Sequence, residues 1–194
     1  MFQRPPALTL LGGTTRVTGH VFIATSLDGF IARPDGGIDW LEKFEDTEDY
    51  GYGAFMARMD GLIMGRGTYE KVLGFGGWPY TKPVVVMSRS LGPEDVRADL
   101  KGRVTIESAS PRALGAALAA QGWRHAYVDG GKLVQSFLRD GLIADITLTR
   151  IPVLLGEGRP LFGALDRDLD LEHVETRSFD PPGFVQSVYR VCAP

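Results

Sequence analysis

The sequence predicts an α/β protein with a mixed, mostly parallel sheet flanked by helices and closed by a C-terminal antiparallel β-hairpin. Two observations indicate this fold class. Short apolar segments alternate with helix-like segments from residue 20 to residue 141, which is typical of a parallel sheet with crossover helices. From residue 143 the pattern changes to consecutive strand-like segments, and residues 169–191 read as two strands around Asp-Pro-Pro-Gly.

Five short segments are predicted as the first strands of the sheet. The purely apolar, β-branched run at 83–88 is typical of a strand that is covered on both faces. The five segments are HVFIAT (20–25), GLIM (61–64), PVVVMS (83–88), RVTIES (103–108) and HAYVDG (125–130).

Four helices are predicted between these strands. Residues 110–121 have the clearest signals, with Ser110 at the cap and Pro111 at the first position. The other three helices span residues 46–59, 68–73 and 132–141, and Gly141 closes the last of them. In the segment 46–59, the residues at helical spacing that would share one face are Tyr52, Phe55, Met56 and Met59.

Composition limits the possible functions. The chain has 194 residues, 44% of them hydrophobic, and a net charge of −3 without a basic run, so we expect a globular protein that binds no nucleic acid. No apolar run reaches membrane-spanning length. We expect one domain over residues 18–194 and a loosely ordered extension over residues 1–17. The single cysteine, Cys192, excludes an internal disulfide and favours the cytoplasm, and the scattered His20, His125 and His173 give no zinc-ligand spacing.

Three strand exits carry polar or glycine-rich residues. Ligands of such sheets bind beyond the carboxyl ends of the strands, so we expect these exits to form one site. The exits are Gly65-Arg66-Gly67-Thr68, Ser88-Arg89-Ser90 and Gly130-Gly131-Lys132.

The residue types at these exits suit an anion. A glycine pair before a helix lets backbone N–H groups approach a phosphate, and the helix N-terminus adds partial positive charge. Arg66 and Arg89 can pair with a phosphate, and the Thr68 hydroxyl can bind a phosphate or cap a helix. Taken singly, the glycine pair could also be a tight turn and each arginine a solvated surface charge. No G-x-G-x-x-G motif follows the first strand, which disfavours an ordinary Rossmann fold.

With these motifs in view, the sequence resembles the dihydrofolate-reductase-like superfamily, in particular the branch of the riboflavin-biosynthesis reductase domain. The resemblance covers residues 18–192 and rests on ATSLDGFIA, LIMGRGTYE, VVVMSRSL, VDGGKLVQSFL and ITLTRIPVLLGEGRPLF, in the family's order. It implies a central mixed sheet, NADPH as hydride donor and a homodimer. The zinc signature of the deaminase that accompanies the bifunctional enzymes is absent from the sequence.

The resemblance also implies roles for individual residues. Gly65, Arg66 and Thr68 match the cofactor-phosphate loop, and Ser88 and Arg89 match the position beside the adenosine ribose phosphate. The pyrophosphate would lie on Gly130, Gly131 and Lys132. The positions that match the first strand and the loop beside the nicotinamide and substrate are Ala24, Ser26, Asp28 and Gly29.

Two acids and two aromatic residues are candidates on the substrate side. Asp49 matches the carboxylate that grips the pterin in folate reductases, and on a helix it would share a face with Tyr52. It could equally be an acid of a helix first turn. Asp28 could assist proton transfer or form an Asx-type turn before Gly29. Trp78, in the loop GFGGWPY, could stack on a heterocycle as part of a mobile flap, or fill the core or a dimer interface.

These observations predict an NADPH-dependent reductase of a small heterocyclic substrate. The resemblance favours 5-amino-6-(5-phosphoribosylamino)uracil as that substrate, with dihydrofolate as the alternative within the class. A non-catalytic nucleotide-binding protein that kept the fold is the alternative from another class, because fold alone does not establish activity. The residues predict no metal site, and the resemblance predicts a homodimer joined through the C-terminal β region.

Overall fold

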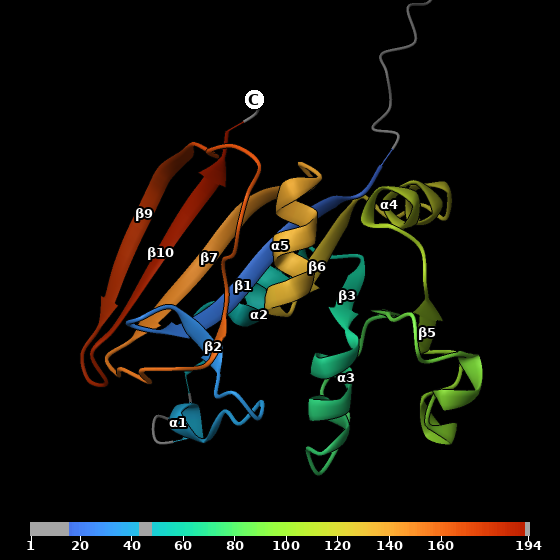
Figure 1. Cartoon of the computed structure of the whole chain (residues 1–194), viewed down its shortest axis with the longest axis horizontal. Helices are drawn as coiled ribbons and strands as arrows, with labels where there is room; N and C mark the ends of the chain where they lie inside the picture. The colour runs from blue at the N-terminus through green and yellow to red at the C-terminus, as the bar shows by residue number, and fades with distance from the viewer. Residues whose placement is uncertain (1–15, 43–47, 193–194) are drawn as a thin grey trace, which may run out of the picture.

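The computed structural model describes residues 16–42 and 48–192. An eight-stranded sheet runs through it in the order β5-β4-β3-β6-β1-β7-β10-β9 (Figure 1). The strands from β5 to β7 are parallel to their neighbours, whereas β10 is antiparallel to both β7 and β9. The predicted fold class is therefore confirmed, including the C-terminal antiparallel hairpin.

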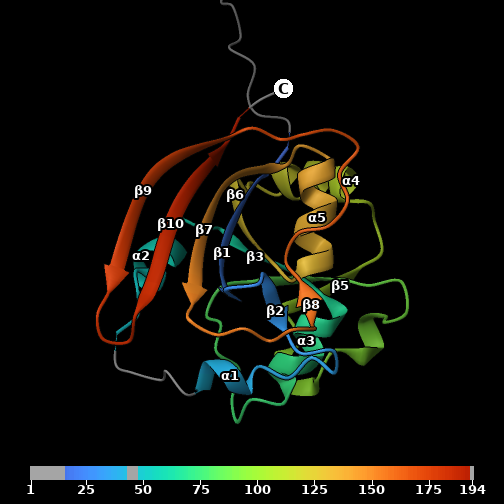
Figure 2. The same ribbon diagram turned by 60° about the vertical axis from the view of Figure 1, so that its left-hand side comes forward.

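The strands follow the apolar segments of the sequence closely. Their bounds are β1 Thr18–Ser26, β3 Gly61–Gly65, β4 Val84–Met87, β5 Val104–Glu107, β6 His125–Asp129, β7 Ile143–Ile151, β9 Leu171–Phe179 and β10 Phe184–Val191. A second sheet of two short strands, β2 (Phe30–Ala32) and β8 (Arg159–Pro160), was not predicted from the sequence. Figure 2 shows β2 and β8 side by side below β1.

Five α-helices and two short 3₁₀ helices connect the strands of the described ranges. The helices are α1 Asp39–Glu42, α2 Tyr52–Ala57, α3 Arg66–Leu73, α4 Pro111–Ala120 and α5 Gly131–Arg139, and the 3₁₀ turns are Pro93–Asp95 and Ala98–Leu100. Helix α4 begins as predicted, because the Ser110 hydroxyl accepts a hydrogen bond from the backbone N–H of Ala113. Helices α5 and α2 lie on opposite faces of the sheet (Figures 1 and 2).

The prediction of one helix over residues 46–59 is wrong for its described part. Helix α2 begins only at Tyr52, because Tyr50 and Gly51 have positive φ angles of 51° and 87°. Asp49 therefore precedes the helix and does not share a helical face with Tyr52. Residues 46 and 47 lie outside the described residues.

The structure also describes parts of both chain ends. Most of the extension predicted over residues 1–17 lies outside the described residues, but Val17 is buried and its N–H donates to the carbonyl of Gly115. The C-terminal hairpin forms one edge of the sheet. In the structure β10 lies between β7 and β9, so β9 forms that edge.

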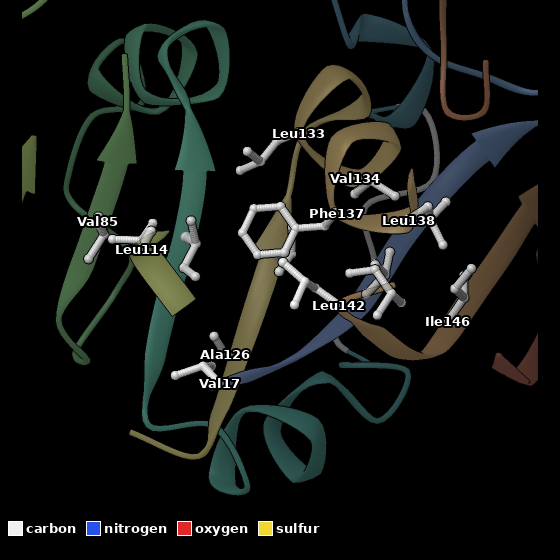
Figure 3. Close-up of a cluster of buried hydrophobic side chains, with 14 of the residues drawn as sticks. Val17, Val85, Leu114, Ala126, Leu133, Val134, Phe137, Leu138, Leu142 and Ile146 are labelled. Carbon is white, nitrogen blue, oxygen red and sulfur yellow. The ribbon is translucent and has the colours of Figure 1, made fainter. Parts of the chain in front are cut away.

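One hydrophobic cluster fills the space between the sheet and α5. Along β1, Val21 and Ile23 point into this cluster, whereas Phe22 points to the opposite face, as the alternation of side chains along a strand requires. Figure 3 shows Phe137 of α5 at the centre of the cluster, between Leu133 and Leu142 in this view. At about 25 cal/mol per Å² of buried apolar surface, such a cluster supplies a large share of the folding free energy.

Candidate active site

The first and third strand exits meet at Thr68 and Gly130. Gly130 has a φ angle of 101°, and a Cβ atom at this position would lie 2.7 Å from Oγ1 of Thr68. The backbone nitrogen of Gly65 lies 3.9 Å from the same point. Only glycine fits here, both because of the positive φ angle and because of the close approach.

The first and second exits meet through Arg66. Its Nη1 donates to the hydroxyl of Ser90 at 2.8 Å, and its Nε donates to Glu70 at 2.7 Å, four residues further along α3. The Ser88 hydroxyl is buried and accepts hydrogen bonds from the backbone N–H groups of Ser90 and Leu91, which shapes the second exit. The expected convergence of the three exits is therefore confirmed.

The helices at this end of the sheet begin without side-chain caps. The residues before the first turns of α3 and α5 are Gly65 and Gly130, which have no side chain to cap the first backbone N–H groups. Helix α4, by contrast, is capped by Ser110. Two uncapped N-termini side by side present backbone N–H groups and partial positive charge to the same place, which favours an anion with two or more phosphates.

Gly131 and Lys132 complete the third exit. A Cβ atom at Gly131 would lie 2.6 Å from the carbonyl oxygen of Pro160, so this glycine is required by the close packing of β8. The side chain of Lys132 is exposed, as is that of Arg89. Arg159 is a further cation that sequence reasoning missed. Its Nη1 lies 3.7 Å from where a Cβ of Gly67 would be, beside the start of α3.

Asp28 and Ser26 hold two loops together. The Ser26 hydroxyl is fully buried and donates to Asp28 at 2.6 Å, and the Asp28 carboxylate accepts from the N–H groups of Leu155 and Gly156. These hydrogen bonds, led by the one from Ser26, lower the pKa of Asp28. The interpretation of Asp28 as an Asx-type turn is wrong, because the backbone N–H of Phe30, which such a turn would use, donates to the Ser26 hydroxyl.

Asp49 shapes the start of α2. Its two carboxylate oxygens accept hydrogen bonds from the backbone N–H groups of Gly51 and Gly53, both at 2.9 Å. These two bonds lower the pKa of Asp49. The carboxylate therefore satisfies N–H groups at the beginning of a helix, which is what a capping acid does.

Trp78 packs against the cluster on the α2 face. Its ring makes edge-on contacts with Tyr69, at 6.1 Å between centroids, and with Tyr80, at 5.3 Å. Tyr69 is 1% exposed and Trp78 is half-buried, so the ring packs on the core, which favours the interpretation of Trp78 as a core residue. The rest of the loop 74–77 is exposed.

Sequence reasoning also missed Asp129. This residue ends β6 directly before Gly130 and points to the same face as Tyr127, two residues earlier. Burial raises the pKa of Asp129 to about 6, against the opposing effect of the Gly130 N–H and the Tyr127 hydroxyl. An acid placed between a buried strand and a glycine pair was the signal that could have identified it.

Three tyrosines surround this carboxyl group. Burial, with a further contribution from Asp129, raises the pKa of Tyr52 to about 12 and also raises those of Tyr80 and Tyr127. The Tyr127 hydroxyl donates to the carbonyl of Phe22 at 2.9 Å. Ala24, the residue expected beside the nicotinamide, follows on the same face of β1 as Phe22 and is half-buried.

The histidines that look scattered in the sequence are partly brought together. His20 is 5% exposed, its Nδ1 lies 2.7 Å from Asp145, and its Nε2 lies 3.0 Å from Nδ1 of His125. Over residues 16–42 and 48–192, no group of three or more His, Cys, Asp or Glu residues has the arrangement of a metal site. No helix of the described chain is long and apolar enough to cross a membrane.

Comparison with known proteins identifies the family. The RibD C-terminal domain matches residues 18–182, and the chain belongs to this family. The protein is thus a member of a reductase-like family with the dihydrofolate-reductase fold, as the sequence motifs predicted.

Its relatives include proteins of unknown role and structures linked to riboflavin biosynthesis. The uncharacterised protein YwjB of Bacillus subtilis is 37% identical over 82% of this chain and 90% of YwjB. A crystal structure of a Shewanella sp. PV-4 protein, provisionally assigned to riboflavin biosynthesis, is 38% identical over 91% of this chain and all of that one, with a TM-score of 0.85. The riboflavin biosynthesis reductase Rib7 of Saccharomyces cerevisiae shares the fold at 14% identity, with a TM-score of 0.63 over 93% of this chain and 92% of Rib7.

Proposed function

We propose that this protein is an NADPH-dependent reductase of a small heterocyclic substrate. The observation that carries the proposal is the meeting of two helix N-termini, both begun by glycine and both without a side-chain cap, with Arg66 beside them. This arrangement supplies N–H donors and cations for several phosphate groups.

The residues present fit a phosphorylated dinucleotide. Gly65, Thr68 and the pair Gly130-Gly131, with Lys132, would hold the pyrophosphate. Ser88, Arg66 and Arg89 would surround the 2′-phosphate of the adenosine ribose, which is the group that distinguishes NADPH from NADH. When bound, the cofactor supplies the hydride, and the protein positions it and excludes water.

The substrate is proposed from the family and from the aromatic face. The Rib7 structure is that of a riboflavin biosynthesis reductase, and a structure from Corynebacterium diphtheriae with the same fold is described as pyrimidine reductase-like. Tyr52, Trp78 and Tyr80 offer rings on the side of the sheet where a planar ring would lie next to Ala24. We propose a ribosylated pyrimidine, 5-amino-6-(5-phosphoribosylamino)uracil, as the substrate to test first.

Calorimetry with NADPH and NADH tests the cofactor. We expect tighter binding of NADPH, because a charge-assisted pair with the 2′-phosphate contributes about 1.5–3 kcal/mol, or ten- to a hundredfold in affinity. Arg89→Ala should remove most of this preference, and Arg66→Ala should reduce it. Arg112→Ala is the control, because Arg112 lies on the surface of α4 beside Asp140. Equal affinities for the two cofactors would contradict the proposal.

We also propose that the protein is a cytoplasmic homodimer joined through its C-terminal β region. Strand β9 is exposed along nearly its whole length, and its apolar Leu171 and Val174 are 44% and 49% exposed. An edge strand of this kind is usually covered by another chain or protected by charge. Light scattering at micromolar concentration would give the mass, and Val174→Asp should lower it to that of one chain. A monomeric wild-type protein would refute the dimer.

A further inference from the structure

Arg159 lies where strand β8 meets the starts of α3 and α5 (Figure 2). As the first residue of β8 it pairs with Ala32 of β2. The next residue, Pro160, packs against Gly131 at the start of α5, and its carbonyl accepts a hydrogen bond from Nε2 of Gln135. The backbone that carries Arg159 is therefore held by both β2 and α5.

The guanidinium of Arg159 lies between two other backbone segments. Its Nη1, Cζ and Nη2 atoms are 3.0, 3.1 and 3.2 Å from where a Cβ of Gly36 would be, and its Nε donates to the carbonyl of Pro34 at 3.2 Å. The same Nη1 lies 3.7 Å from the corresponding point on Gly67, in the first turn of α3. One side chain thus spans the turn 33–37 and the start of this helix.

This guanidinium has no acid as a partner among the described residues. Arg33, on the same turn, pairs with both carboxylate oxygens of Asp39, and Arg66 pairs with Glu70. Within the part of the chain that the structure describes, Arg159 forms no ion pair, and its Nη1 and Nη2 donate to no acceptor. The side chain is exposed, so these N–H donors remain available to a ligand.

The position of this charge is unfavourable without an anion. A helix N-terminus carries partial positive charge, so a cation is stabilising at the opposite end of a helix and is repelled at the start. Arg159 nevertheless presents Nη1 to the first turn of α3, and no described acid offsets the repulsion. An anion at the starts of α3 and α5 would attract the guanidinium as well as both helix N-termini. Arginine suits a phosphate in particular, because its planar fork can donate to two oxygens.

We propose that Arg159 binds the pyrophosphate of the cofactor and thereby fastens the turn 33–37 to it. This inference rests on the proposed reductase function. Arg159 lies beside Gly67 and Gly131, at the two helix starts, whereas the 2′-phosphate is assigned to the exit at Ser88. One N–H holds the Pro34 carbonyl while the others contact phosphate, so the bound cofactor orders the turn. Arg159 is a positioning residue and takes no part in hydride transfer.

Calorimetry with three ligands separates the two phosphate subsites. NADPH and NADH both contain the pyrophosphate, whereas adenosine 2′-monophosphate contains only the phosphate assigned to Arg89. Arg159→Gln should weaken NADPH and NADH by the same factor, about ten- to a hundredfold, and leave adenosine 2′-monophosphate unchanged. Arg159→Lys keeps the charge without the fork and should recover part of the loss. Arg89→Ala should instead weaken NADPH and adenosine 2′-monophosphate and leave NADH unchanged.

The matched control removes the same charge elsewhere. Arg167→Gln changes an exposed arginine in the loop between β8 and β9, and it should bind all three ligands as the wild type does. Arg159 is also exposed, so Arg159→Gln should keep a melting temperature close to that of the wild type.

Hydrogen exchange tests the link to the turn and needs no substitution. The N–H groups of Arg33 and Gly36 close the turn by donating to the carbonyls of Gly37 and Arg33. In the wild-type protein, saturating NADPH or NADH should slow the exchange of these two amides several-fold, and adenosine 2′-monophosphate should not. In Arg159→Gln, saturating NADPH should no longer slow it.

The outcomes separate this inference from the proposed function. Unchanged affinities of Arg159→Gln for both dinucleotides would overturn the inference and leave the function intact. Weaker binding of ribose 5-phosphate by the same variant would then assign the side chain to a substrate phosphate. Unchanged exchange in the turn of the wild-type protein with saturating NADPH would overturn the link to the turn. If the wild-type protein binds neither dinucleotide, the proposed function itself fails, and this inference with it.

Discussion

The two faces of the central sheet are built for different purposes. The face under α5 is a continuous apolar cluster, in which Phe137 is 2% and Val134 0% exposed. The face under α2 carries hydroxyl-bearing rings and ends at Asp129, a carboxyl group that is half-buried beside a glycine turn. A buried carboxyl costs free energy that an apolar side chain does not. The first face therefore stabilises the fold by apolar burial, whereas the second retains polar groups at the end where the three strand exits meet.

Removing Phe137 should give the largest effect on the α5 face. We expect Phe137→Ala to lower the free energy of unfolding by about 3–5 kcal/mol, because it leaves a cavity among closely packed side chains. Denaturant unfolding measures this loss. Phe75→Ala is the matched control, since Phe75 is 41% exposed in the loop after α3. The cofactor affinity of the folded fraction should not change. A large change in that affinity would contradict a purely structural role for the α5 face.

Trp78 tests how far the α2 face is also structural. Trp78→Ala should destabilise the protein by about 2–3 kcal/mol, less than Phe137→Ala, because the ring is only half-buried against Tyr69 and Tyr80. Thermal and denaturant unfolding measure the loss. If Trp78→Ala keeps wild-type stability and loses substrate affinity, the loop is a substrate flap, as one interpretation of the sequence suggested.

Gly130 lies at the end of the sheet where both faces meet the candidate site. Gly130→Ala should cost about 1–2 kcal/mol of stability from its positive φ angle and should weaken cofactor binding as well, because the added Cβ would lie 2.7 Å from the Thr68 Oγ1. Gly141→Ala is the matched control, with a φ angle of 64° and no atom within 4 Å of an added Cβ. It should lose stability only. Equal cofactor affinities in the two variants would exclude a role for this turn in binding.

The sequence predicted the parts of the molecule that depend on local chemistry. Apolar segments located the strands, and glycines with polar neighbours located the three exits, because both signals lie within a few adjacent residues. Helix α2 was predicted too long, because the helical spacing of apolar residues does not reveal the positive φ angles of Tyr50 and Gly51. Asp129 was missed for a different reason. Its raised pKa depends on burial, and the tyrosines that it acts on, Tyr52 and Tyr80, come from distant parts of the chain and meet it only in the fold.

Substitution of Asp49 should have the smallest effect on stability, and it tests whether this acid on the α2 face is structural or functional. Asn can also cap a helix, so Asp49→Asn should lower the melting temperature only slightly, and Asp49→Ala somewhat more. The folded protein holds the pKa of Asp49 below its value of about 3.9 in the unfolded chain, because the Gly51 and Gly53 N–H groups bind the ionised form.

The ionised carboxylate thus stabilises the fold at pH values above about 4, and this contribution is lost as the pH falls through the lowered pKa. The melting temperatures of wild type and Asp49→Asn should therefore differ at pH 7 and converge in acid. Turnover should stay within about tenfold of wild type, because a capping carboxylate that remains ionised does not donate a proton. A larger loss of turnover with an unchanged melting temperature would contradict the capping role and would make Asp49 a functional acid.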